Sequence, residues 1–180
     1  TISASALMGM PALSPRAGAQ PPDPLQDWLA AHAKTIRTAD PQDEDFRDLE
    51  PLAAAIGSAR VVQLGEPSHG AGTAFAAKAR IVKFLHQRLG FDVLIWESGL
   101  YDVALAQSAM RDPSTDAVSA AQKGVFTLWA DAAEVKPLFE YIKASQPSLC
   151  PLEMAGFDMQ VTADGTRERS AKDLIAFVAD

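Results

Sequence analysis

The sequence is poor in the residues that usually mark disulfide-bonded or metal-binding proteins. It has one cysteine and three histidines among 180 residues, and aromatic residues make up only 7% of it. Cys150 has no second cysteine to pair with, so an internal disulfide is excluded, and no histidine stands near it in the sequence. We interpret Cys150 as an inert small side chain rather than a nucleophile. The scarcity of histidine gives weight to any that stands in a chemical setting.

Positive charge and long apolar runs are also lacking. Lys and Arg number 16 against 23 Asp and Glu, which gives a net charge of −7 and a pI near 4.9. An acidic chain is a poor partner for nucleic acid or an anionic membrane surface. No run is long and apolar enough to span a bilayer. These absences favour a small or weakly polar molecule as the ligand and say nothing of oligomeric state.

The N-terminal segment, residues 1–24, resembles an export signal more than a folded element. It has no initiator Met and no basic start, but its small residues end in Ala17-Gly18-Ala19, the A-x-A form of a signal-peptidase site. We expect a signal-peptide remnant followed by a disordered lead-in, and hence a periplasmic or secreted protein. A plain disordered tail on a cytoplasmic protein is the alternative. Residues 25–180 are expected to be one α/β domain.

Hydrophobic periodicity predicts alternating helices and strands. Strands are expected at 59–64, 91–96 and 152–157, each a short apolar run. Helices are expected at 25–36, 46–56, 73–89, 100–111, 135–142 and 170–179. A strand, helix and strand with short joints form a βαβ unit, so the predicted fold is a parallel or mixed sheet flanked by helices. His32, on the apolar face of the first helix, is interpreted as a packed, hydrogen-bonded residue rather than a ligand.

The most informative motif is Gly65-Glu66-Pro67-Ser68-His69-Gly70, between the first predicted strand and the following helix. Loops at strand ends often carry function because the sheet holds them in place. An acid three residues before a histidine can orient and tune that imidazole as a general base. The motif lacks the G-x-S-x-G pattern of a serine nucleophile, and the glycines after it do not complete a dinucleotide fingerprint.

Three predicted strands each end in a carboxylate, at Glu66, Glu97 and Asp158. If the strands are neighbours, these acids meet at one rim of the sheet, where like charges raise one another's pKa. Each acid could instead simply cap a nearby helix; for three of them with His69 we favour a site. A lone histidine with scattered acids is a weak metal-ligand set, so no metal and no cofactor are expected.

Lys78 lies on the apolar stripe of the helix that follows the motif. Phe75, Val82 and Leu85 share that stripe, whereas Arg80, Lys83 and Gln87 are predicted to face outward. A cation that points toward a sheet needs a carboxylate partner, and Glu66 and Glu97 are the candidates. The alternative is a lysine whose ammonium reaches solvent near the helix start.

These segments together resemble the erythromycin esterase family. The resemblance rests on the Glu66–His69 motif, Lys78, the run Gly90-Phe91-Asp92-Val93-Leu94, Glu97-Ser98-Gly99, Trp129 with Glu134, and Ala155-Gly156-Phe157-Asp158, and it covers roughly residues 46–160. It implies a metal-independent hydrolase that opens a macrolide lactone or another ester, as in antibiotic resistance by lactone hydrolysis.

The resemblance also implies the site residues. His69 corresponds to the general base, Glu66 to its neighbouring acid, Lys78 to the basic residue of the next helix and Glu97 to the strand-end acid. Ser68, Trp129, Glu134 and Asp158 are expected to contact substrate.

Two departures from the family matter. Family members are longer and use a further histidine from their second half, whereas none follows His86 here, so the chain is expected to be the N-terminal part of a larger domain. Inactivity of the isolated fragment is a further alternative. Ala71 stands where relatives often carry a polar residue, which leaves the substrate open. A non-catalytic protein that binds a small molecule or metal on the same scaffold is the alternative function.

Overall fold

The computed structural model describes residues 23–66, 68–161 and 166–179. The chain separates into two units, residues 1–34 and 35–180, each taken by itself here. The expected signal-peptide remnant, with its cleavage site after Ala19, lies outside the described residues. None of the described helices is long and apolar enough to cross a membrane.

The described part of the first unit contains α1 (Pro24–His32). The Asp23 carboxylate accepts a hydrogen bond from the amide of Leu25 and so caps the helix start. His32 donates from Nδ1 to the carbonyl of Trp28 at 2.7 Å, and the two rings stack with centroids 4.6 Å apart. The predicted hydrogen bond of His32 is confirmed. The predicted burial is wrong, because His32 is exposed on a helix whose residues are all exposed.

The second unit begins with a polar loop and two short helices, η1 (Phe46–Leu49) and α2 (Glu50–Ile56), which end at Gly57. Gly57 has φ 54°, a conformation that glycine adopts without the clash of a Cβ atom. Phe46 and Leu49 pack with Phe84 and Leu85 in a small apolar cluster. The predicted helix over 46–56 is thus confirmed, with its first turn tightened to a 3₁₀ helix.

The predicted strand at 59–64 is not formed. The segment has no regular secondary structure, with Val62 and Leu64 half-buried against the two apolar clusters and Val61 74% exposed. Its Val-rich composition favours an extended backbone, but a strand also needs a neighbour that shares its hydrogen bonds, and the two strands of the described chain, β1 (Val93–Gly99) and β2 (Glu153–Asp158), pair only with each other. The predicted βαβ unit around the motif is therefore wrong in its first strand.

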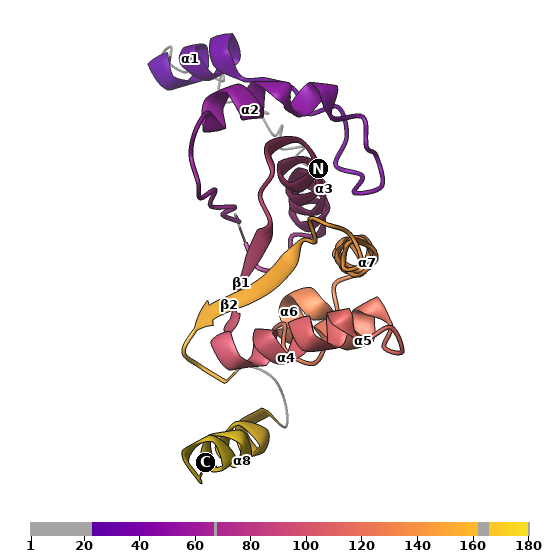
Figure 1. The fold of residues 1–180 in the computed structure, drawn as a ribbon. Helices are drawn as coiled ribbons and strands as arrows, with labels where there is room; N and C mark the ends of the chain where they lie inside the picture. Colours follow the sequence, from indigo (N-terminus) through magenta and orange to yellow (C-terminus); the bar gives the residue numbers. More distant parts are fainter. Residues whose placement is uncertain (1–22, 67, 162–165, 180) are drawn as a thin grey trace, which may run out of the picture. The chain divides into compact units, whose positions relative to one another are not determined.

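The sheet consists of β1 (Val93–Gly99) and β2 (Glu153–Asp158), which run parallel (Figure 1). Val93 pairs with Glu153 and Trp96 with Gly156, but Gly99 pairs with Asp158, so the register shifts by one residue near the end. Such an irregularity bends a strand and re-aims its side chains. The predicted α/β class, with parallel strands flanked by helices, is confirmed.

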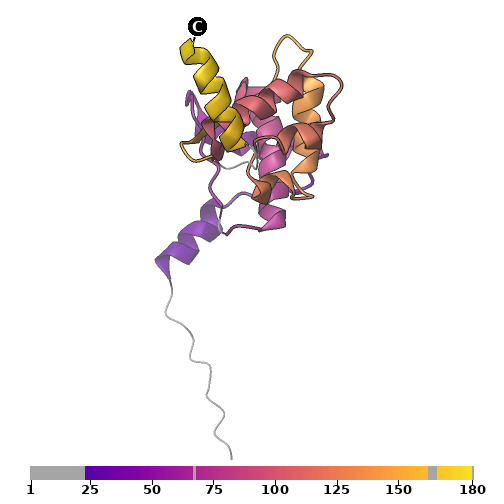
Figure 2. The ribbon, with the colours of Figure 1, turned by 90° about the horizontal axis from the view of Figure 1, so that it is seen from below.

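Helices pack against this pair of strands. α3 (Gly72–Leu89) ends at Gly90, whose φ is 72°. In the sequence, four helices connect β1 to β2: α4 (Leu100–Arg111), α5 (Ala117–Ala121), α6 (Thr127–Ala130) and α7 (Lys136–Ser145). α4 packs on β2, and α3 lies beside α7 in both Figure 1 and Figure 2. The main core forms here and includes Val135, which precedes α7, and the α7 residues Leu138, Phe139 and Ile142.

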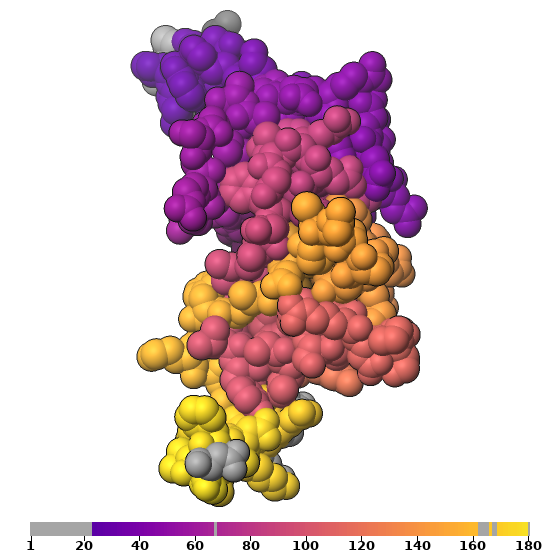
Figure 3. Space-filling model, in the orientation of Figure 1, coloured from indigo at the N-terminus to yellow at the C-terminus, as the bar shows by residue number. Residues whose placement is uncertain are grey.

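α8 (Thr166–Ala179) follows the second gap in the description. Its apolar residues Leu174, Ile175, Phe177 and Val178 are 63–80% exposed, and it is visible as the yellow segment in Figure 3. The helix predicted over 170–179 is thus confirmed, and it begins four residues earlier.

The predicted outer face of α3 is wrong for two of its three residues. Arg80 and Lys83 are only 1% and 6% exposed, whereas Gln87 is exposed as expected. The acidic loop of residues 38–48 covers this face, so both cations meet carboxylates and carbonyl oxygens rather than water. Sequence periodicity marks which face is polar, but it does not say whether another segment covers that face.

Candidate functional site

Glu66, His69 and Lys78 come together at the start of α3. The imidazole bonds the Glu66 carboxylate through Nδ1 and Oε1, and Lys78 Nζ donates to the other oxygen, Oε2, at 3.3 Å. The turn between the motif and the helix uses Gly70 with φ 81°, a conformation that glycine adopts without the clash of a Cβ atom. One carboxylate thus holds both basic groups, as the sequence predicted for Lys78 and Glu66.

The hydrogen bond fixes the tautomer of His69. An ionised carboxylate can only accept, so Nδ1 carries the proton and the neutral ring keeps its lone pair on Nε2. The His69 side chain is 66% exposed, whereas that of Glu66 is only 13% exposed. In the described part of the chain, Nε2 has no hydrogen-bond partner. An imidazole with an oriented, unoccupied Nε2 is suited to take a proton from water.

Opposing effects act on the pKa of Glu66. Its burial raises the pKa, but the hydrogen bonds from His69 and Lys78 and the charge of Lys78 outweigh burial and hold the pKa below its usual value. Glu66 is therefore ionised across the neutral range, which keeps it an acceptor for His69.

Trp129 and Glu134 lie next to this cluster. The Trp129 and His69 rings meet at 85°, with centroids 6.3 Å apart. The exposed side chain of Glu134 lies over the first turn of α3, so that a Cβ added to Gly72 would be 2.5 Å from Glu134 Oε1. A carboxylate at a helix N-terminus is favourable because unpaired N–H groups gather there. α7 begins at Lys136 without a side-chain cap, so Glu134 does not cap that helix.

The remaining predicted residues are less connected. Ser68 is exposed and donates weakly, at 3.4 Å, to the carbonyl of His69. Asp158 ends β2 as predicted, but its carboxylate accepts from the amide of Gln160 in a local turn. Glu97 lies inside β1 on its exposed face, opposite Trp96 and Ser98, rather than at the strand end. No hydrogen bond or ion pair among the described residues links Glu97 or Asp158 to His69 or Lys78, so the convergence of the three acids at one rim stays a prediction.

Sequence reasoning missed Ser98. Its side chain is fully buried, and its Oγ accepts a hydrogen bond from the amide of Phe126 at 2.9 Å. Phe126 is the residue at which α6 begins, and α6 carries Trp129. A serine beside a strand-end acid could have been flagged for this role, because a buried hydroxyl needs a hydrogen-bond partner.

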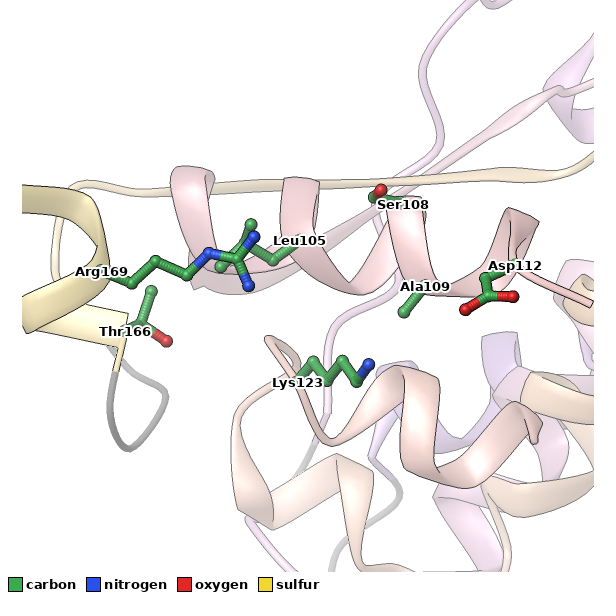
Figure 4. Close-up of a pocket in the computed structure, with 7 residues that line it drawn as sticks. All are labelled: Leu105, Ser108, Ala109, Asp112, Lys123, Thr166 and Arg169. Carbon is green, nitrogen blue, oxygen red and sulfur yellow. The ribbon is translucent and has the colours of Figure 1, made fainter. Parts of the chain in front are cut away.

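Two hollows of the surface lie away from His69. One, of about 480 Å³, is lined by Leu105, Ser108, Ala109, Asp112, Lys123, Thr166 and Arg169. Figure 4 shows Arg169 reaching from α8 toward Leu105 on α4, with Lys123 entering from the segment after α5. Another, of about 620 Å³, adjoins His86 and Cys150. None of the predicted catalytic residues lines either hollow. The candidate site is therefore defined by the contacts among Glu66, His69 and Lys78 rather than by a cavity.

Among the described residues no group of three or more His, Cys, Asp or Glu side chains is placed to hold a metal ion.

Two curated proteins resemble the chain in sequence. A Bacillus subtilis (strain 168) protein named "Putative hydrolase YbfO" is 35% identical over 133 residues, 74% of this chain and 28% of that protein. The Escherichia coli protein named "Erythromycin esterase type II" is 31% identical over 92 residues, 51% of this chain and 22% of that protein. No family model matches the chain.

Two crystal structures share the fold. A Bacillus cereus protein superposes with a TM-score of 0.65 and 29% identity over 74% of this chain and 32% of its own. A protein described as a succinoglycan biosynthesis protein gives a TM-score of 0.64 at 24% identity, over 72% of this chain and 32% of its own, and this likeness concerns the fold alone. The chain spans less than a third of each of these four relatives.

Proposed function

We propose that residues 25–180 are part of a hydrolase of the erythromycin esterase type, in which His69 activates water to attack an ester or lactone carbonyl. The observation that carries the proposal is the pair of bonds on Glu66, which orients His69 through Nδ1 and leaves Nε2 open to solvent. The names of the two similar curated proteins support hydrolysis as the reaction class. Export to the periplasm or secretion remains part of the proposal.

In the proposed reaction, Nε2 of His69 takes a proton from water as the water oxygen bonds to the carbonyl carbon. The carbonyl π electrons move to its oxygen and form a tetrahedral oxyanion. Collapse of the oxyanion breaks the bond to the alcohol oxygen, which receives the proton from Nε2. Ester and water thereby become carboxylic acid and alcohol, and Nδ1 keeps its proton on the Glu66 side throughout. A general base of this kind contributes about 10²- to 10⁴-fold to the rate.

Lys78 has a supporting role in this scheme. Its ammonium lies on Glu66 Oε2 at 3.3 Å and lowers the pKa of the carboxyl, so it keeps the acid ionised. An ionised Glu66 stabilises the imidazolium that forms when His69 takes the proton.

The test is product mass spectrometry on the full-length protein, incubated with erythromycin and with a panel of simple esters. His69→Ala is compared with His32→Ala, which removes an exposed histidine from α1 as a matched control. A macrolide that gains one water, in a reaction lost in His69→Ala, kept in His32→Ala and indifferent to a chelator, supports lactone hydrolysis. Turnover of simple esters alone keeps the mechanism and rejects the antibiotic. No turnover of any ester favours the alternative, a non-catalytic binding protein.

A further inference from the structure

We propose that Trp129 is a positioning residue that fixes the ring orientation of His69, and that the buried Ser98 hydroxyl holds Trp129 in place. This inference rests on the proposed function, because it matters only if Nε2 of His69 must point at a water. It assigns Trp129 a role through His69 rather than the substrate contact expected from the sequence.

The hydrogen bond to Glu66 restrains the His69 ring but does not lock it. A hydrogen bond tolerates a spread of distances and angles, so small coupled changes in χ1 and χ2 can still swing Nε2 while Nδ1 stays near the carboxylate. Because the side chain is 66% exposed, few neighbours oppose that rotation. The Trp129 indole, 9% exposed, stands at 85° to the ring with centroids 6.3 Å apart, within the range of edge-to-face aromatic contacts. It therefore limits the rotation that the hydrogen bond allows.

Trp129 can serve as a wall because other aromatic rings hold it. Phe126 packs against it with ring centroids 5.9 Å apart, and Trp96 does so at 6.3 Å. Trp96 in turn packs on Phe139 of α7 at 5.6 Å. The indole is thus part of the main core, whose close packing resists rotation of the Trp129 side chain.

The backbone that carries Trp129 is anchored separately. The fully buried Ser98 Oγ accepts from the Phe126 amide at 2.9 Å and so ties the start of α6 to the end of β1. Two residues earlier, Gly124 lies directly on the Asp102 carbonyl of α4, where no Cβ would fit. Ser98, in the segment Glu97-Ser98-Gly99, therefore helps to position His69 indirectly. It holds the Phe126 amide, and the helix that follows carries Trp129 against the His69 ring.

The kinetic test compares Trp129→Phe, Trp129→Leu and Ser98→Ala in the full-length protein, with Trp28→Leu in α1 as the matched control. Leucine keeps apolar bulk but loses the aromatic wall, so we expect kcat to fall about 10- to 100-fold, with KM changed less than about twofold. Phenylalanine should stay within about threefold of the parent, and Ser98→Ala should lie between the two. Trp28→Leu should leave both constants unchanged.

A second measurement follows the contact itself without substrate. In NMR spectra, the carbon-bound ring protons of His69 should shift in Trp129→Leu while those of His32 do not, and Trp28→Leu should give the converse. A rise in KM at constant kcat would overturn the proposal in favour of substrate contact, and unchanged kinetics or unshifted His69 protons would overturn it outright. If Trp129→Leu fails to fold, Ser98→Ala and Trp129→Phe decide the matter by the same readouts. Turnover that survives His69→Ala would reject the proposed function instead. The shift of the His69 ring protons in Trp129→Leu would still show whether Trp129 contacts His69.

Discussion

Arg80 on α3 binds Asp48 through two parallel hydrogen bonds, Nη1 to Oδ2 at 2.9 Å and Nη2 to Oδ1 at 2.7 Å. The Arg80 side chain is 1% exposed, and its remaining donors reach backbone carbonyl oxygens of the loop that precedes η1. This pair fastens the acidic loop to the helix that carries Lys78 two residues earlier. The electrostatic network that stabilises α3 therefore lies on the face opposite the candidate site.

Arg80→Met is expected to destabilise the protein strongly. It removes the cation but leaves Asp48, a carboxylate whose side chain is 10% exposed, without its partner. Breaking a buried pair in this way costs roughly 3–5 kcal/mol of unfolding free energy. Urea denaturation followed by circular dichroism measures the loss. Arg88→Met, at an exposed position of the same helix, should change the free energy by less than about 0.5 kcal/mol; equal effects of the two variants would contradict the assignment.

The same pair predicts acid sensitivity. The hydrogen bond from Arg80, opposed by burial, holds the pKa of Asp48 at about 2, below the 3.8 of the unfolded chain. Since the folded pKa is depressed, its stabilising contribution is fully present above pH 3.8 and is lost as the pH falls toward about 2. The shift corresponds to roughly 2 kcal/mol. Asp48→Asn should be less stable than the parent at neutral pH, but it should lose less unfolding free energy as the pH falls below 3.8. Parallel pH profiles of stability for parent and variant would reject the linkage.

His69→Ala should abolish hydrolysis while leaving the melting temperature nearly unchanged. The reason is that the imidazole is 66% exposed and packs only at its edge against Trp129. Glu66→Gln should reduce kcat about 10²-fold or more, because an amide oxygen neither stabilises the imidazolium nor pairs with Lys78 as the carboxylate does. Steady-state kinetics and thermal melts are the measurements. A large drop in melting temperature for His69→Ala would make the residue structural.

Two glycine substitutions should differ sharply in cost. A Cβ on Gly124 would collide with the backbone carbonyl of Asp102, which α4 holds in place, so Gly124→Ala should cost roughly 3 kcal/mol. A Cβ on Gly72 meets only the end of the exposed Glu134 side chain, at 2.5 Å, which can swing away. Because alanine also favours the helix by about 1 kcal/mol, Gly72→Ala should be close to neutral. Chemical denaturation of both variants tests the contrast, and similar losses would show that the α4 backbone yields.

Local sequence signals were sufficient for most elements. The helices expected over 46–56 and 73–89 end at Gly57 and Gly90, where positive-φ conformations suit glycine. The apolar spacing on α7 identified its buried face. The bond from Lys78 to Glu66 followed from a cation on an apolar stripe, which must find a carboxylate nearby.

Pairing between distant segments was not predictable in the same way. The Val-rich run at 59–64 has the composition of a strand, but a ladder depends on which segment lies beside it. The inward turn of Arg80 depends on the acidic loop, some 35 residues earlier in the chain, folding back onto α3. Glu97 was expected at a strand end, and the register shift near Gly99 extends β1 beyond it instead.

The sheet of the described chain has no interior strand. Each of β1 and β2 has a paired neighbour on one side only, so each also carries a row of backbone groups along its other edge. Val93, Ile95 and Phe157 on these strands are 46%, 55% and 64% exposed. An open edge with apolar side chains is a template for further strands from other molecules. The 180-residue chain is therefore expected to associate through the edges of this sheet as its concentration rises.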